Sequence, residues 1–362
     1  SGSWGYGISG MTHLFKGGLQ IDANGVWSDN TGTISFEGVR SGTIAMNGTG
    51  SFKHLRIDKA ENYTTMWLAS NWDTGTEQAF QISKGILMIN GVNFQTRGDL
   101  SVGNGGKLQL VPGSTLTLRS GKTLEIQSGG SLLSHGASGQ RALITNLNGY
   151  HELNVLSGGT ISAEQTIFEK MAADGINILS GAIVDPDYSF NNCWFRYGVM
   201  SGTLLKINNN QYLTITNPVF TSNPQPNGSQ YNLTKTLNQG ALSVEGESGA
   251  FSGMMYENDI YMRIHWSSDV PIIGFNQQSL EFNDVYITEY GEIDMGIGNP
   301  GTSYLVGTIS TPDCFTVSTI GRIDHPEISV PPQKEAEFGG SRNVIDFSVP
   351  PGMVSYYRVR FT

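Results

Sequence analysis

The chain has 362 residues, of which 14% are charged and 47 are glycine, and its formal net charge is −10. Helical proteins cover their solvent faces with Glu, Lys and Arg, so this neutral-polar, glycine-rich composition favours an all-β fold with many turns. The basic stripe of a nucleic-acid binder and the roughly 20-residue apolar run of a membrane-spanning helix are both missing from the sequence. We therefore expect no nucleic-acid partner and no membrane span.

The first hundred residues carry short β-rich segments of irregular spacing, at residues 33–36, 43–46, 52–57, 86–89 and 99–102. We interpret them as the start of a parallel β-helix domain over residues 1–268, with a cap formed by its first 14 residues. The acidic stretch from Asp22 to Gly25 with Asp29 resembles part of a calcium loop. It lacks the alternating ligands and the closing Glu of an EF-hand, so we favour an ordinary turn.

Two tryptophans in this first part are candidate carbohydrate contacts. Trp72 lies in a loop-like stretch between Asn71 and Asp73, and Trp67 lies close by in the sequence. An exposed indole ring can stack against a sugar ring, and neighbouring polar side chains can bind the sugar hydroxyls. The alternative is that Trp72 folds back against the solenoid and packs there.

Between residues 108 and 133 the sequence alternates in a strict pattern. Leu-x-Leu or a close variant recurs at residues 108–110, 116–118, 124–126 and 131–133, about eight residues apart, with Gly, Ser and Pro between them. The alternation directs two side chains inward and one outward, and the intervening residues form corners. Three such strands make a coil of roughly 24 residues, so the pattern predicts a three-sided parallel β-solenoid.

Three longer phrases then recur at intervals of 23 and 21 residues: Asn-Val-Leu-Ser-Gly from residue 154, Asn-Ile-Leu-Ser-Gly from residue 177 and Gly-Val-Met-Ser-Gly from residue 198. A period this short indicates one solenoid coil per repeat, because each coil can bury its inward residues only against its neighbours. The alignment predicts one inward column formed by Val155, Ile178 and Val199.

Residues 162–175 allow two interpretations. A capping box that begins at Ser162 and a glycine at position 175 are typical of a helix. However, residues 166–168 align with residues 192–195 and 217–220 in successive coils. This register favours a strand.

Asp185 and Asp187, which flank Pro186, are the best carboxylate pair of the solenoid. At a coil corner they would bind Ca²⁺ or act as a catalytic acid and base, whereas the alternative is a solvated turn. We expect the asparagines at residues 191–192 and 208–210 to form amide ladders between coils. The sequence thus predicts no cofactor and no catalytic residue, with Asp185 and Asp187 as the open alternative for catalysis or for Ca²⁺.

From residue 269 the pattern changes to six or seven alternating strands within about 90 residues, which predicts a β-sandwich. The segments at residues 280–282, 298–301, 305–312, 315–317, 349–352 and 358–361 resemble the Hydin-like immunoglobulin-type modules. This resemblance implies an immunoglobulin-like sandwich over residues 269–362 that is truncated at its C-terminus. In bacteria, such modules occur in large secreted proteins, commonly beside β-helices.

The solenoid part resembles the right-handed parallel β-helix proteins of Bacteroidota-type bacteria, through residues 98–106 and 126–132. The surface cargo of these bacteria often uses the type IX secretion route. The resemblance therefore implies a right-handed coil and an extracellular or cell-surface location. We also expect the natural polypeptide to extend beyond both ends of this chain, as part of a larger protein or assembly.

These observations predict a non-catalytic structural or adhesive protein that binds carbohydrate along its solenoid face, with glycans or other surface proteins as partners. The alternative is a polysaccharide lyase or glycoside hydrolase of the β-helix type. Three or more acidic side chains on one solenoid face would favour the enzyme. Ladders of Thr, Ser and Asn without charge clusters would favour the structural protein.

Overall fold

A computed structural model describes residues 11–27, 32–50, 54–75, 79–221 and 228–266, and in the C-terminal part residues 274–275, 291–298, 305–311, 315–323, 338–342, 344–349 and 354–361. The chain divides into two compact units, Ser1–Ser252 with Tyr256–Ser267 and Gly253–Met255 with Ser268–Thr362. Almost all regular structure is β-strand, and the described residues contain one short 3-10 helix, η1 (Met254–Tyr256). No helix of the described part is long and apolar enough to cross a bilayer.

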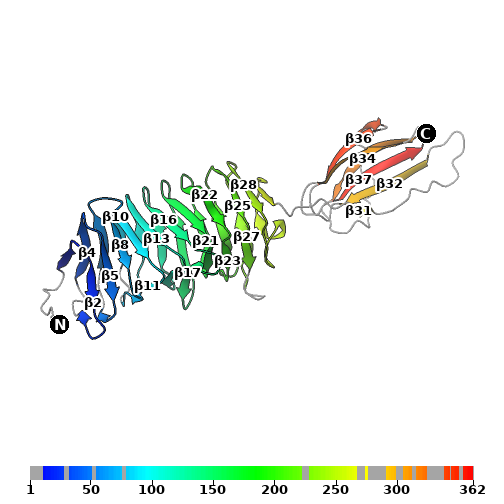
Figure 1. Cartoon of the computed structure of the whole chain (residues 1–362). Coiled ribbons are helices and arrows are strands. Elements are labelled where there is room, and N and C mark those ends of the chain that lie inside the picture. Colours follow the sequence, from blue (N-terminus) through cyan, green and yellow to red (C-terminus); the bar gives the residue numbers. More distant parts are fainter. Residues whose placement is uncertain are drawn as a thin grey trace. The chain divides into compact units, whose positions relative to one another are not determined.

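The first unit is a parallel β-solenoid of about ten stacked coils, coloured from blue to yellow-green in Figure 1. Its strands form three series, in each of which strands of successive coils pair in parallel. The first series contains β1 (Thr12–Phe15), β4 (Thr33–Gly38), β7 (His54–Lys59), β10 (Phe80–Ile89), β12 (Leu100–Val102), β15 (Thr123–Ile126), β18 (His151–Val155), β21 (Met171–Ile178), β24 (Thr203–Ile207), β27 (Tyr231–Thr234) and β29 (Glu257–Asn258).

The second and third series complete the coils. The second contains β2 (Leu19–Ile21), β5 (Gly42–Met46), β8 (Thr65–Leu68), the second half of β10, β13 (Gly106–Leu110), β16 (Ser131–His135), β19 (Thr160–Glu164) and β22 (Ile183–Asn191). In the coils that follow β22, a separate group of parallel strands contains β25 (Tyr212–Thr216), β28 (Ala241–Glu245) and β30 (Ile264–Trp266). The third contains β9 (Trp72–Asp73), β11 (Asn93–Thr96), β14 (Thr115–Arg119), β17 (Ala142–Leu147), β20 (Thr166–Glu169), β23 (Trp194–Arg196) and β26 (Val219–Thr221). Near the N-terminus, β3 (Val26–Trp27) also pairs in parallel with β6 (Thr49–Gly50).

The Leu-x-Leu prediction is confirmed, because every second residue of β13, β14 and β15 is buried inside the coil. The inward leucines and isoleucine of β13, β14 and β15 are all fully buried: Leu108, Leu110, Leu116, Leu118, Leu124 and Ile126. Inward residues stack from coil to coil, so each coil buries the apolar face that its neighbour would otherwise expose.

The predicted inward column is wrong at one of its three positions, that of Val199. Val155 pairs with Ile178 as expected, but Ile178 pairs with Ile207 rather than with Val199. The coil that follows Ile178 is longer, because Ile207 comes 29 residues later whereas Ile178 comes 23 residues after Val155. Val199 lies between β23 and β24, where its amide donates to the carbonyl of Met171. A phrase similar in sequence therefore occupies a different position in the coil.

The corners between the first and second series depend on glycine. Gly129 and Gly158 have φ values of 73° and 76°, a left-handed conformation that side chains disfavour. The amide of Gly129 donates to the carbonyl of Gly158 at 2.8 Å, and the amide of Gly158 donates to that of Gly181 at the same distance. These bonds stack one corner upon the next.

Residues 162–175 form strands, as the register predicted. The segment contains parts of β19 and β21 and all of β20, and Phe168 pairs with Phe195, which pairs with Phe220. The three rings stack at centroid distances of 5.7 and 5.1 Å. One of the predicted amide contacts between coils is present, with Asn217 Nδ2 donating to Asn192 Oδ1 at 3.3 Å, whereas Asn208 donates to the hydroxyl of Thr236 and Asn209 to the carbonyl of Ala182.

The end of the solenoid is a partial coil. Residues 256–266 contribute β29 and β30, which pair with β27 and β28. Trp266 is buried, and its ring lies against Phe220 at 5.9 Å. Most of the predicted N-terminal cap lies outside the described residues, and residues 12–14 belong to β1.

The second unit is antiparallel. The strands β31 (Gly274–Phe275), β32 (Gly291–Gly298), β37 (Val354–Phe361), β34 (Phe315–Ile323) and β35 (Phe338–Arg342) form one sheet, and β33 (Leu305–Ser310) pairs with β36 (Val344–Val349). Its core contains Ile297, Val317, Val349, Tyr357 and Val359. The alternating strands expected from residue 269 onward are thus present in the described part of this unit, and the segment at residues 280–282 lies outside it.

Candidate functional site

A column of polar side chains runs along the outer face of the first series. Successive register partners are Gln81, Ser101, Glu125, Asn154, Asn177 and Lys206. Their neighbours along each strand point inward and are buried, so alternation directs these six side chains outward. Within the column, Asn177 Nδ2 donates to Asn154 Oδ1 at 3.0 Å. The face is therefore a hydrogen-bonding surface that spans six coils.

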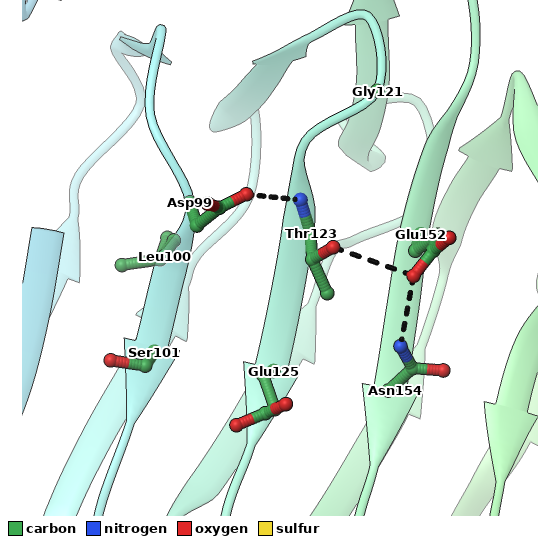
Figure 2. Close-up of a pocket in the computed structure, with 8 residues that line it drawn as sticks. All are labelled: Asp99, Leu100, Ser101, Gly121, Thr123, Glu125, Glu152 and Asn154. Atoms are coloured by element: carbon green, nitrogen blue, oxygen red, sulfur yellow. Dashed lines mark hydrogen bonds between the residues drawn. The ribbon is translucent and has the colours of Figure 1, made fainter. Parts of the chain in front are cut away.

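Three carboxylates line a hollow on this face, with a volume of about 470 Å³ (Figure 2). Asp99 lies just before β12, Glu125 lies on β15 and Glu152 lies on β18. The other lining residues are Leu100, Ser101, Gly121, Thr123 and Asn154.

Neighbouring strands hold these acids in place through hydrogen bonds. Asp99 accepts from the amide of Thr123 at 3.0 Å. Glu152 Oε2 accepts from Thr123 Oγ1 at 3.4 Å and from Asn154 Nδ2 at 3.3 Å. None of the ion pairs among the described residues includes Asp99, Glu125 or Glu152. The hollow is therefore acidic and rich in hydrogen-bond acceptors.

The predicted pair Asp185 and Asp187 lies elsewhere, in the second series. Ile161 of β19 pairs with Val184, but the next paired residue, Ala163, faces Ser189. Residues 185–188 thus form a bulge within β22 and do not lie at a coil corner. The described residues contain no group of three His, Cys, Asp or Glu side chains that could hold a metal ion.

The bulge brings Asp185 to two residues of earlier coils. The Ser162 hydroxyl donates to Asp185 Oδ2 at 2.9 Å, and His135 Nε2 lies 2.8 Å from the same hydroxyl oxygen. Tyr188 lies against the His135 ring, with a centroid distance of 4.5 Å. Asp187 contributes its amide, which donates to Asp185 Oδ1 at 3.1 Å. Three strands, β16, β19 and β22, therefore build one cluster.

The hydrogen-bond order fixes the roles of these groups. A carboxylate oxygen only accepts, so the Ser162 proton points to Asp185 and His135 must donate through Nε2. Burial lowers the pKa of His135, although Glu164 and Asp185 act in the opposite direction. The imidazole is therefore neutral near pH 7, and its Nδ1 keeps a lone pair. Ser162 is only 3% exposed and cannot serve as an accessible nucleophile.

The two candidate tryptophans have different environments. Trp72 is only 5% exposed and packs against Phe94 at a centroid distance of 5.4 Å, in agreement with the alternative in which it folds back against the solenoid. The reason is register, because Trp72 occupies an inward position of β9 opposite Phe94. Trp67 is 38% exposed on β8, where it lies between Thr43 and Met88.

The acidic stretch near the N-terminus has the structure of a turn. The amide of Gly25 donates to the carbonyl of Asp22 at 2.7 Å, and Asp22 Oδ1 accepts from Gln20 Nε2 at 2.6 Å. Asp29 lies outside the described residues. The described part of this stretch is thus explained by local hydrogen bonds.

Sequence reasoning missed the acidic hollow, His135 and Ser162 as site residues. His135, Ser162 and Asp185 are separated by 27 and 23 residues, and these spacings acquire meaning only when the length of each coil is known. No protein-family model matches the chain, and no curated protein matches its sequence.

Proposed function

We propose that this protein is a non-catalytic structural or adhesive protein of the cell surface that binds carbohydrate along the outer face of its solenoid. In this proposal the coil is right-handed and three-sided, and the antiparallel C-terminal unit is an immunoglobulin-like, Hydin-like module that acts as a spacer. Glycans or other surface proteins are its partners. The proposed extracellular location and the type IX secretion route rest on the resemblance to Bacteroidota-type β-helices.

The polar outer face of the first series, with its column of hydrogen-bonding side chains and its acidic hollow, is the observation that carries carbohydrate binding, which the enzyme considered below would share. Its carboxylates, hydroxyl and amide offer acceptors and donors at fixed positions on a rigid sheet, which suits the many hydroxyl groups of a sugar chain. Among the residues that the structure describes, no Lys or Arg forms an ion pair with the three carboxylates of the hollow. Their negative charge would therefore repel an acidic sugar. We therefore infer that the ligand is a neutral or amino-sugar polysaccharide that lies across the coils.

Calorimetric titration with a panel of neutral, cationic and anionic polysaccharides tests this function. We expect a neutral or cationic member to bind, and the double variant E125Q/E152Q to weaken its binding at least tenfold while the fold persists. The E245Q variant, which alters an exposed acid on β28, is the matched control and should bind as the wild type does. Lack of binding to every member of the panel would refute the proposal.

The second candidate function is that of a β-helix glycoside hydrolase or lyase, and the three carboxylates in one hollow favour it. Glu152 faces Thr123, two residues from Glu125, so the backbone positions of the two glutamates lie about 8 Å apart by strand geometry. Because Glu125 and Glu152 lie on the same face of neighbouring strands, their carboxyl groups can flank a substrate bound there as acid and base. Release of reducing ends or of unsaturated products from the bound polysaccharide, abolished in E125Q and in E152Q, would establish the enzyme.

A further inference from the structure

The bulge of β22 interrupts a regular ladder. From β13 to β16 and from β16 to β19 the strands of the second series pair residue by residue, whereas four residues of β22 leave the register opposite Ser162. Bulges often occur where a sheet must redirect a side chain, and they are frequent beside functional sites. Here the redirected side chains are those of Asp185 and Tyr188.

Tyr188 is held in place although it is exposed. Its ring lies against His135, two coils away, and 38% of the residue remains accessible. An aromatic ring that packing fixes at a surface loses little conformational entropy on binding, and it offers an apolar face to the C–H groups of a sugar.

Hydrogen-bond acceptors lie close to His135, on which this ring packs. The hydrogen bonds that join His135, Ser162 and Asp185 leave the Nδ1 atom of His135 as an acceptor. Glu164 is the register partner of His135 on β19, and it takes part in none of the ion pairs among the residues that the structure describes. An apolar platform beside fixed acceptors is complementary to a pyranose ring, which has an apolar face and hydroxyl donors at its edge.

We propose that the β22 bulge is a second sugar-binding site, in which an uncharged pyranose unit stacks on Tyr188 and donates hydroxyl hydrogen bonds to His135. This inference rests on the proposed carbohydrate-binding function and extends it to a separate face of the solenoid. Ser162 and Asp185 act as positioning residues, because they hold the imidazole in the tautomer that accepts at Nδ1.

The probes are cellohexaose, maltohexaose and chitohexaose, with hexagalacturonate as the anionic counterpart. Addition of at least one neutral hexasaccharide should shift the ring resonances of His135 in NMR spectra of the full chain, and hexagalacturonate should not. Y188A should weaken the binding that His135 reports at least tenfold, whereas Y188F should retain it within about threefold. S162A should weaken it several-fold and change the tautomer seen in the imidazole nitrogen shifts.

Two controls separate this inference from the proposed function. Y63A removes an exposed tyrosine at a distant turn and should leave the His135 response unchanged. E125Q/E152Q disrupts the acidic hollow and should also leave that response intact. If Y188A binds every probe as the wild type does while E125Q/E152Q loses binding, the bulge is not a site and the proposed function stands. If no neutral hexasaccharide binds to the wild type by NMR or calorimetry, the second site is wrong, and the polysaccharide panel described above then decides the proposed function by itself.

Discussion

At the scale of single residues, the buried side chain of His151 makes the stability of the solenoid depend on pH. It is fully buried at the start of β18, and burial lowers the pKa of its imidazole to about 3. The same group titrates near 6.5 in an unfolded chain. Because the folded-state pKa is the lower one, the contribution of His151 to stability is complete above about pH 6.5 and is lost as the pH falls towards 3.

We therefore expect the free energy of unfolding of the solenoid to fall by a few kcal/mol, on the order set by this linkage, between pH 7 and pH 4. A His151→Met variant should lose that part of the pH dependence, because it carries no titrating group at this position. Urea unfolding at several pH values measures both proteins. An equal decrease in wild type and variant would contradict the assignment.

Lys59 is a buried polar residue that stabilises the backbone of a neighbouring coil through hydrogen bonds. Its Nζ donates to the carbonyls of Glu37 and Arg40, each at 3.0 Å, and burial lowers the pKa of the amine. A Lys59→Met variant removes both bonds but keeps much of the side-chain volume, so we expect a loss of about 2–3 kcal/mol in unfolding free energy. Lys107→Met, at an outward position of β13, is the matched control, with an expected change within about 0.5 kcal/mol. Denaturant titration decides between these outcomes.

At the scale of elements, the register between β21 and β24 determines which residue completes the column of Val155 and Ile178. Ile207 is fully buried, whereas Val199 is half-buried between strands. We expect Ile207→Ala to destabilise the solenoid by about 2–5 kcal/mol and Val199→Ala to cost clearly less. Thermal and urea unfolding of the two variants compare them directly, and a larger cost at Val199 would restore the alignment that the sequence repeat predicted.

At the scale of the whole molecule, the chain has two separate cores. The solenoid buries leucine, isoleucine and valine inside its coils, and the C-terminal unit buries a cluster that includes Val317 and Val359. Because the two clusters are distinct, we expect calorimetry of the full chain to show two unfolding transitions. Leu124→Ala should lower the midpoint of one transition by several degrees, and Val317→Ala should lower the other. A shift of both midpoints by either variant would indicate a single cooperative unit.

The parallel solenoid could be predicted from particular residues. Leu108, Leu110, Leu116 and Leu118 alternate with polar residues and are separated by glycine-rich corners, and an alternation of period two determines which face of a strand is buried wherever the strand pairs. The aromatic triplet of Phe168, Phe195 and Phe220 was predicted differently, by the alignment of one segment in three successive coils. The alternation within a strand depends only on residues that are close in the sequence, so it can be recognised without knowledge of the tertiary structure.

The sequence by itself determined the fold class, the inward positions of the regular coils and the change of pattern near residue 269. Only the tertiary structure decided that Val199 leaves the column, that Trp72 is buried and that His135, Ser162 and Asp185 meet across three coils. The physical reason is that coil lengths vary and a bulge shifts the register. The residues that become neighbours across coils therefore depend on the summed lengths of all intervening turns, and no local pattern carries that sum.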